Sequence, residues 1–364
     1  MRRQEAIYTV VIRGGQSGLS VGYRLQQRGI PFVILDAAPR TGDAWRHRWD
    51  SLRLFTPARI DGLDGLAFPA APNYYPTKDE MADYLEVYVR HFDLPVRLGV
   101  KVDRLTRVGE RFMVAAGDRV VAADNVVVAM SAWQYSKRPP FAAELAPDIF
   151  QIHSRDYRRP AQLPEGDALV VGAGNSGAEI ALELSASRRV GLAGRHPGSE
   201  PFDVDGWFGS TVGARLMEFI LHRVLTRDTA LGRKVIATYF GKGAPVVRAK
   251  PRQLAAAGVS RVDPITHSRN GLPATADGST FDVASVIWAC GYDPGLEWID
   301  LDILDANVLP RHRLGIVDEA PGLYFVGQPF QYSISSHTIF GVGRDAARVV
   351  EAIVARSEAP VGVG

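Results

Sequence analysis

The stretch IYTVVIRGGQSG, residues 7–18, decides the fold, because a short apolar run ends there in a loop rich in glycine. The following LSVGYRLQQRG (19–29) predicts a helix closed by Gly29, and PFVILD (31–36) predicts a second strand. Strand, glycine loop, helix and strand in this order form the βαβ unit that opens a dinucleotide-binding domain. The N-terminal region is therefore expected to be α/β with a parallel sheet.

The same order of elements returns later in the chain. ALVV (168–171) leads into GAGNSG (172–177), then into a predicted helix and the strand RVGLAGR, residues 189–195. Equivalent positions in the two copies are 159 residues apart (174 − 15, 177 − 18 and 195 − 36): Gly15 and Gly174, Gly18 and Gly177, Asp36 and Arg195. A lone GxGxxG is a weak signal, but a register kept through loop, helix and strand predicts two dinucleotide-binding domains.

Three further apolar runs indicate how the two domains are connected. NVVVAMS (125–131) and SVIWACGY (285–292) each run from a predicted strand into a small-residue turn, where we expect the chain to cross between domains. GLYFVGQ (322–328) is a predicted return strand before the final helix. The sequence therefore predicts two Rossmann-like, doubly wound, three-layer domains, with residues 161–279 inserted into a first domain made of 1–160 plus 280–364.

The segment from Pro201 to Ala257 resembles neither copy. Residues 200–250 are expected to form a lid-like insertion or a wall of a substrate channel, because SEPFDVDGWFGSTVG (199–213) is rich in glycine and aromatic residues. The helical stretch that follows carries apolar residues at a spacing more typical of a buried helix core: Met217, Phe219, Ile220, Val224 and Leu225. We therefore expect a lid from the loop and core from the helix.

The ends of the two equivalent second strands predict different nucleotides. Asp36 can accept hydrogen bonds from a ribose diol, as FAD or NAD would present. Arg195 offers positive charge to a 2′-phosphate, so the second site is expected to prefer NADPH. The alternative is that both residues are merely solvated strand ends. In the second loop, Gly172 would make the tight turn and Gly174 would let backbone amides approach a pyrophosphate.

Composition and charge exclude several classes of protein. The 42 Lys and Arg nearly balance the 40 Asp and Glu, which leaves a net charge of +2 and no basic stripe for nucleic acid. Cys290 is the single cysteine, which rules out an internal disulfide and a CxxC redox pair. No apolar run approaches the roughly 18 residues needed to cross a bilayer, so a cytoplasmic protein with no membrane partner is expected. His312 and His337 lack partners at metal-ligand spacing, and no metal is expected.

Over nearly its whole length the sequence resembles the bacterial class B flavin-containing monooxygenases, a family that also holds the plant indole-pyruvate monooxygenases. The resemblance rests on the paired glycine loops and on several motifs: TGDAWRHRWDSLRLFTP (41–57), YPTKDEMADYL (75–85), HSRDY (153–157), VIWACGY (286–292) and GLYFVGQPFQYSISS (322–336). It implies an FAD- and NADPH-dependent monooxygenase that uses O2, through a flavin C4a-hydroperoxide, on a small or medium hydrophobic metabolite. A homodimer is compatible with it.

The resemblance also implies which residues hold the cofactors. FAD would lie against Gly14, Gly15, Gln16, Gly18, Asp36, Arg40 and Trp45. NADPH would lie against Gly172, Gly174, Asn175, Ser176, Gly177 and Arg195. Because the cofactor carries the chemistry, no catalytic acid or base is assigned. His153 and Tyr157 match the end of a family motif and are expected to act in a hinge or an interdomain hydrogen bond, and Cys290 as a small buried side chain.

Arg13 departs from the motif, because the 159-residue register places it opposite Gly172 (172 − 13). If this turn needs a positive φ, a non-glycine residue costs roughly 1–2 kcal/mol there. Alternatively, the turn keeps a negative φ and the guanidinium assists the FAD phosphates; an introduced substitution is a third explanation. Met130 and Ser131 also replace the usual turn beside the flavin. The alternative function is therefore a family member that has lost FAD and serves as a flavin-independent biosynthetic enzyme or a nucleotide-binding interaction protein.

Overall fold

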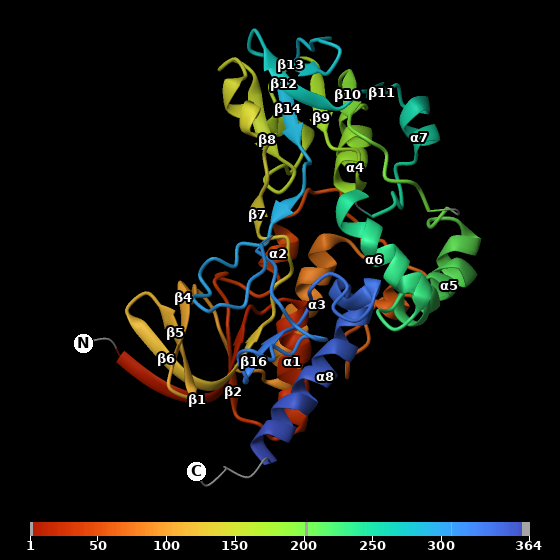
Figure 1. The fold of residues 1–364 in the computed structure, drawn as a ribbon. Coiled ribbons are helices and arrows are strands. Elements are labelled where there is room, and N and C mark those ends of the chain that lie inside the picture. Colours follow the sequence, from red (N-terminus) through yellow and green to blue (C-terminus); the bar gives the residue numbers. More distant parts are fainter. Residues whose placement is uncertain (1–2, 201–202, 243, 307, 359–364) are drawn as a thin grey trace.

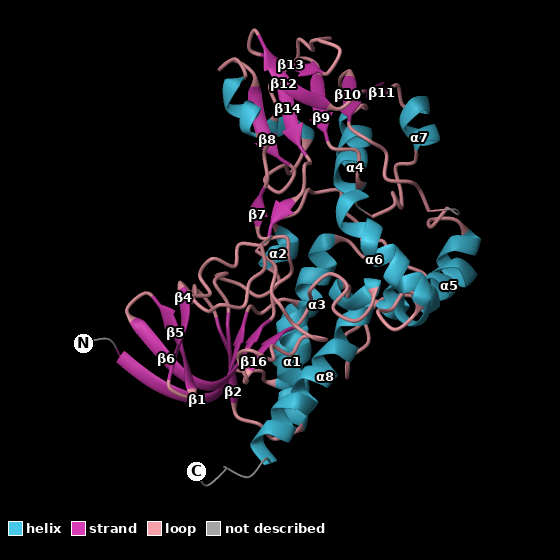
Figure 2. Ribbon diagram, viewed as in Figure 1, coloured by secondary structure: helices cyan, strands magenta, loops and turns pink. Residues whose placement is uncertain are grey.

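The computed structural model describes residues 3–200, 203–242, 244–306 and 308–358. Two sheets stand one above the other, each with helices packed beside it (Figures 1 and 2). Residues 201, 202 and 243 of the expected lid lie outside the described residues, as do both ends of the expected first domain. No helix in the described ranges is long and apolar enough to cross a membrane.

The first sheet has seven strands, of which five are parallel in the order β3, β2, β1, β6 and β16. The hairpin of β4 and β5 adds antiparallel strands to β6. Helices α1 and α8 lie side by side on one face (Figure 1), and their aliphatic side chains bury that face. The elements are β1 (Arg3–Ile12), α1 (Gln16–Gln27), β2 (Phe32–Leu35), α2 (Asp43–Arg46), α3 (Lys78–Phe92), β3 (Val96–Arg97), β4 (Arg104–Val108), β5 (Arg111–Ala116), β6 (Arg119–Val128), β16 (Leu323–Phe325) and α8 (Ile339–Glu358).

The second sheet has five parallel strands in the order β11, β10, β9, β14 and β8. Helix α4 connects β9 to β10, as α1 connects β1 to β2 in the first sheet. The predicted fold of two doubly wound dinucleotide-binding domains is thus confirmed. The elements are β8 (Phe150–His153), β9 (Ala168–Val171), α4 (Asn175–Leu184), β10 (Val190–Ala193), α7 (Pro251–Ala256), β11 (Ser260–Val262), the hairpin β12 (Ile265–Arg269) and β13 (Leu272–Thr275), and β14 (Ser285–Trp288).

The chain crosses twice between the sheets, through β7 (Tyr135–Ser136) and β15 (Tyr292–Asp293), which pair antiparallel as a two-stranded ribbon. Strands β8 and β14 of the second sheet lie outside the range 161–279 expected for the inserted domain. Sequence pattern alone does not show which sheet a buried strand joins, because that depends on its partner. We propose that the domain limits lie at this ribbon instead of at residues 160 and 280.

The segment expected to be a lid is helical over most of its described length. Residues 209–224 form a continuous helix in which π-helical turns precede and follow α5 (Ala214–Phe219). Helix α6 (Ala230–Lys242) comes next. The expectation that its apolar residues form core is wrong at Phe219, whose side chain is 58% exposed. Helical spacing shows that residues share a face, but it does not show that another element covers this face.

Candidate functional site

Arg13 holds the turn between β1 and α1 in the left-handed region, with a φ of +90°, where the equivalent Gly172 has +117°. Its N–H donates to the carbonyl of Leu35, as that of Gly172 does to Ala193, so the two turns have the same backbone pattern. The alternative in which Arg13 keeps a negative φ is therefore wrong. An arginine in this conformation costs roughly 1–2 kcal/mol, which the surrounding contacts must offset.

The Arg13 guanidinium lies between two polar side chains at the mouth of the loop. Its Nη2 donates to Oε1 of Gln134 over 3.0 Å, and Nη1 lies 3.7 Å from Oδ1 of Asp36. Gln134 belongs to the crossing segment, where its own amide donates to the carbonyl of Ser131 over 2.8 Å. Arg13 thus links the glycine loop to the passage between the domains, and it shares the carboxylate that was predicted to bind a ribose.

The other residues of the first loop form an open cradle. The Gly14 N–H donates to Oδ2 of buried Asp36 over 3.0 Å, and a β-carbon on Gly14 would lie 2.9 Å from that oxygen. A β-carbon on Gly15 would meet nothing within 4 Å, whereas one on Gly18 would lie 1.8 Å from the carbonyl oxygen of Arg13. Gln16 begins α1, so its helix N-terminus opens beside the empty space at Gly15.

Arg40 and Trp45 occupy the edge of this site. The Arg40 guanidinium forms an ion pair with Glu86, and Asp83 lies 3.9 Å from it. Its charge is therefore already paired with carboxylates. Trp45 belongs to α2 and packs, partly buried, against the core under the first sheet. Contact of either side chain with FAD stays a prediction.

The segment after β6 places unsatisfied polar atoms beside the first loop. Ser131 Oγ and His337 Nδ1 are buried and have no hydrogen-bond partner among the described residues. The His337 ring meets that of Trp133 edge-on at 4.7 Å, and burial lowers the pKa of His337 to about 4, so it stays neutral. The Met130 carbonyl, by contrast, accepts from Nε2 of Gln328 over 2.5 Å. Buried polar atoms without partners are rare in native structures, and a polar ligand here would satisfy them.

The second loop has the glycine pattern intact. A β-carbon on Gly172 would lie 2.2 Å from the carbonyl oxygen of Ala289, and one on Gly177 would lie 1.8 Å from that of Gly172. Gly174, like Gly15, faces open space, and Ser176 lies in the first turn of α4. The Asn175 side chain is already engaged, since it donates to Pro245 and accepts from the N–H of Val247. It therefore positions the 245–247 segment against the loop.

Three basic side chains gather where β10 ends. Arg195 is exposed, and Nη2 of Arg261 on β11 donates to the carbonyl of Gly194 over 2.5 Å. Desolvation and the charge of Arg261 lower the pKa of His196. Neither arginine forms an ion pair with Asp or Glu in the described part of the chain. Sequence reasoning found Arg195 but missed Arg261, because only the pairing of β10 with β11 brings it to this strand end.

His153, Tyr157 and Cys290 lie around the passage between the domains. Buried His153 donates through Nε2 to the carbonyl of Gly291 over 3.1 Å, because its Nδ1 accepts from the N–H of Arg155. Tyr157 donates to Oε2 of Glu183 over 2.6 Å. Burial raises the pKa of the Cys290 thiol to about 11, so the thiol is protonated and unreactive at neutral pH. These contacts favour positioning roles over chemical ones.

Arg248 fastens the lid segment to the first domain. Its Nη1 and Nη2 donate to the carbonyls of Arg53 and Leu54 over 3.0 and 2.8 Å, and its Nε lies 3.1 Å from both carboxylate oxygens of Asp205. The guanidinium also lies 5.1 Å from the ring centre of Tyr75. Nearby Glu179 on α4 has a buried oxygen without a partner among the described residues, and burial raises its pKa to about 7.

Replacing Arg248 by lysine should loosen this attachment. Lysine keeps the charge but lacks the planar fork that reaches both carbonyls and the carboxylate, so we expect a loss of about 2 kcal/mol in the free energy of unfolding. Urea denaturation measures this loss, and limited proteolysis should cut the 203–242 segment faster. The control is Arg313→Lys, at an exposed pair with Asp318, which should change neither. Equal effects of both variants would contradict the role of Arg248.

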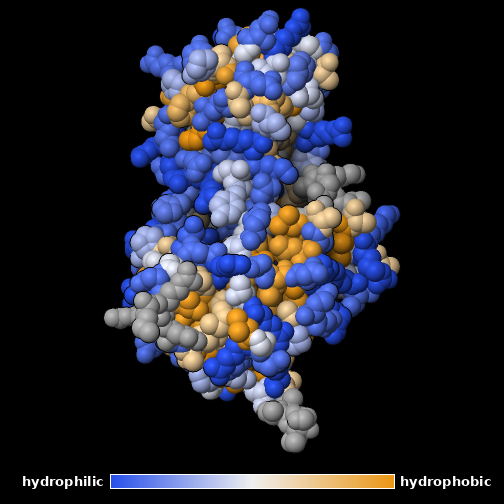
Figure 3. All heavy atoms as spheres, turned by 60° about the vertical axis from the view of Figure 1, so that its left-hand side comes forward, coloured by the Kyte–Doolittle hydropathy of each residue, from blue (hydrophilic) through white to orange (hydrophobic). Residues whose placement is uncertain are grey.

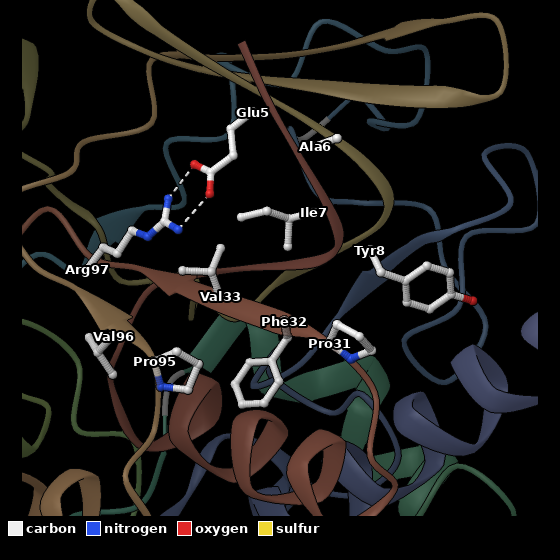
Figure 4. Close-up of a pocket in the computed structure, with 10 residues that line it drawn as sticks. All are labelled: Glu5, Ala6, Ile7, Tyr8, Pro31, Phe32, Val33, Pro95, Val96 and Arg97. Carbon is white, nitrogen blue, oxygen red and sulfur yellow. Dashed lines mark hydrogen bonds and ion pairs between the residues drawn. The ribbon is translucent and has the colours of Figure 1, made fainter. Parts of the chain in front are cut away.

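A surface pocket of about 390 Å³ lies at the opposite end of the first sheet (Figure 4). Pro31, Phe32 and Val33 line it at the start of β2, whereas the glycine loop follows the end of β1. Glu5 and Arg97 beside it form a two-pronged ion pair at 2.6 and 2.8 Å, so their charges satisfy each other. In doubly wound sheets ligands bind at the carboxyl ends of the strands, and we therefore place the candidate site at the glycine loops.

Two sheets whose parallel strands each present a glycine loop and a helix N-terminus define an oxidoreductase with two dinucleotide-binding domains. Residues 10–240 match the family model described as pyridine nucleotide-disulphide oxidoreductase, and the chain belongs to this broad family despite its single cysteine. Within it, the chain belongs to the flavin-containing monooxygenases, and it is an enzyme of that type.

The similarity extends over whole chains. The chain is 38% identical over 358 residues to an uncharacterized CzcO-like oxidoreductase of Geobacillus kaustophilus, covering 96% of this chain and 99% of the relative. It is 27% identical over 391 residues to the indole-3-pyruvate monooxygenase YUCCA4 of Oryza sativa, covering 95% and 87%. The solved flavin-containing monooxygenase from Stenotrophomonas maltophilia superposes with a TM-score of 0.79 at 30% identity, covering 97% and 99%.

Proposed function

We propose that this chain is an FAD- and NADPH-dependent monooxygenase that acts on a small or medium hydrophobic metabolite. The observation that carries the proposal is the matched pair of loops, in which Gly15 and Gly174 both face open space at a helix N-terminus. The buried, unpartnered atoms Oγ of Ser131 and Nδ1 of His337 are polar groups that a flavin beside the first loop would satisfy. The residues present thus fit both cofactors, with Arg13 as the exception.

Each group of residues has a distinct task in this proposal. FAD, when bound, would accept a hydride from NADPH and activate O2 for transfer to the substrate. Backbone amides at Gly14 and Gly15 would hold its pyrophosphate, and Asp36 its ribose. The loop at Gly174 would hold the NADPH pyrophosphate, and Arg195 with Arg261 the 2′-phosphate. The lid, fastened by Arg248, would keep water from the reacting groups.

A second candidate rests on Arg13 itself. Its contact with Asp36 opposes the arrangement that a flavin ribose needs, because it engages the carboxylate that was predicted to accept from the ribose. Under this proposal FAD is lost or weakly held, while the intact second loop still binds NADPH. The chain would then act as a flavin-independent biosynthetic enzyme or as a nucleotide-binding interaction protein.

Colour and turnover separate the two candidates. If the chain is a monooxygenase, the purified protein should be yellow, with an absorbance band at about 450 nm from bound flavin. It should also consume NADPH and O2 when FAD is supplied. If the purified protein is colourless, its titration with FAD and with NADPH is the decisive measurement. Protein that binds NADPH but takes up no FAD would exclude the monooxygenase and leave the second candidate. Location in the cytoplasm and a homodimer stay predictions.

A further inference from the structure

The lid segment carries a group of large apolar side chains that are exposed to solvent. Trp207 is 78% exposed, and the large apolar side chains around it are each about half exposed or more: Phe208, Val212, Leu216, Phe219 and Leu231. Val212, Leu216 and Phe219 are spaced by four and three residues along a continuous helical run, which puts them on one side. We call these six residues the lid face. The segment that carries the lid face lies at the right of Figure 1, at α5, and is turned away in Figure 3, whose visible side is largely hydrophilic with apolar surface near its middle.

Hydrogen bonds to its backbone carbonyls fasten the segment to the first domain, while the side chains of the lid face stay exposed. Tyr75 donates to the carbonyl of Val204 over 2.6 Å, and Nη2 of Arg59 donates to that of Thr211 over 2.9 Å. At the other end, Nη1 of Arg344 donates to the carbonyl of His222, and Nε of Arg227 to that of Phe330, both over 2.6 Å. These hydrogen bonds hold the segment in place. Its apolar side chains are therefore exposed on a segment that is attached to the rest of the protein.

Four basic side chains in the same segment as the lid face have no ion pair with an acidic residue in the described part of the chain. Arg215, Arg223, Arg233 and Lys234 are all exposed, and none forms an ion pair with Asp or Glu within the described ranges. Between residues 207 and 237 only Glu218 and Asp228 are acidic. Exposed Trp, Phe and Leu bordered by unpaired Arg and Lys are the pattern of helices that lie in a membrane interface.

We propose that the lid face docks on a membrane surface that carries anionic lipid headgroups. The apolar side chains would enter the headgroup boundary, and the four cations would meet lipid phosphates. Charge argues against a second copy of this chain, because a twofold contact would bring like cations together across the interface. The proposal does not depend on the proposed function, since it concerns the outer side of the lid and not the glycine loops.

Flotation with lipid vesicles tests the proposal on the full chain. We expect the protein to float with vesicles of phosphatidylcholine and phosphatidylglycerol in equal parts, much less with phosphatidylcholine alone, and less at high salt. The double variant Arg215→Gln/Arg223→Gln should bind about 25-fold more weakly, because each arginine near an anionic surface contributes roughly fivefold. Trp207→Ser/Phe219→Ser should weaken binding on the order of tenfold through lost apolar burial.

Matched controls separate the lid face from general stickiness. Arg252→Gln removes an exposed arginine on α7, and Val108→Ser removes a side chain that is 67% exposed on β4, and both should bind like the parent. Unchanged thermal unfolding and NADPH titration show that each variant is folded. Absence of vesicle binding, or equal loss in the controls, overturns the proposal. So does a dimer in solution that Trp207→Ser/Phe219→Ser disperses, because the face would then bind a second copy.

Discussion

Replacing Arg13 by glycine is expected to raise the affinity for FAD about fivefold. In the parent, a flavin ribose competes with the guanidinium for the carboxylate of Asp36, and an ion pair at 3.7 Å with a partly exposed arginine contributes roughly 1 kcal/mol at most. Glycine also relieves the left-handed strain at φ +90°, which frees the turn to adjust around a pyrophosphate. Quenching of FAD fluorescence during titration with protein measures the change.

Two further variants separate the two causes. Arg13→Ala removes the guanidinium but leaves a β-carbon at positive φ, so it matches glycine only if the side chain is the obstacle. Gln134→Ala removes one partner of Arg13 and leaves the contact with Asp36, and it should change the affinity little. Weaker FAD binding by Arg13→Gly would contradict the prediction and show that the guanidinium neutralises the phosphates.

Replacing Arg195 by alanine is expected to weaken NADPH about 10- to 100-fold and to leave NADH nearly unchanged. Only NADPH carries the 2′-phosphate, and a charge-assisted contact to it contributes roughly 1.5–3 kcal/mol. Arg261→Ala should shift the same ratio in the same direction but less, because its guanidinium also serves the carbonyl of Gly194. Titration calorimetry with each nucleotide gives both affinities.

The control for this selectivity lies at the other end of the same strand. Arg189 precedes β10 and pairs with Asp167 over 2.9 Å, so Arg189→Ala changes the net charge equally without touching the strand end that carries Arg195. It should affect NADPH and NADH alike and weakly. If Arg195→Ala weakened both nucleotides equally, Arg195 would not select between them.

The sequence predicted the strands, loops and helices of both nucleotide-binding units wherever glycine spacing and apolar runs agree. The 159-residue register located both loops, and the structure gives Arg13 and Gly172 the same turn and the same kind of backbone hydrogen bond. This works because part of the requirement for glycine is met within the loop itself, as where a β-carbon on Gly18 would collide with the carbonyl oxygen of Arg13. The class of enzyme followed from the same motifs.

Features that depend on distant partners were not readable. Arg261 reaches the carbonyl of Gly194 at the end of β10 only because β11 pairs with β10, and β8 joins the second sheet only by pairing with β14. The position of the Arg13 side chain depends on Gln134, which is 121 residues away. The exposure of Phe219 depends on whether another element packs against its side of the helix, and helical periodicity does not show this.

The pairing of β16 with β6 sets an order of assembly during synthesis. Leu323–Phe325 pair with Val126–Val128, and α8 packs against α1, so the first sheet stays incomplete until the last helix has left the ribosome. All five strands of the second sheet lie before residue 289 and can assemble earlier. Until β16 is synthesised, the end of β6 that pairs with it is an unpaired apolar strand edge, and the nascent chain would need protection from aggregation at this edge.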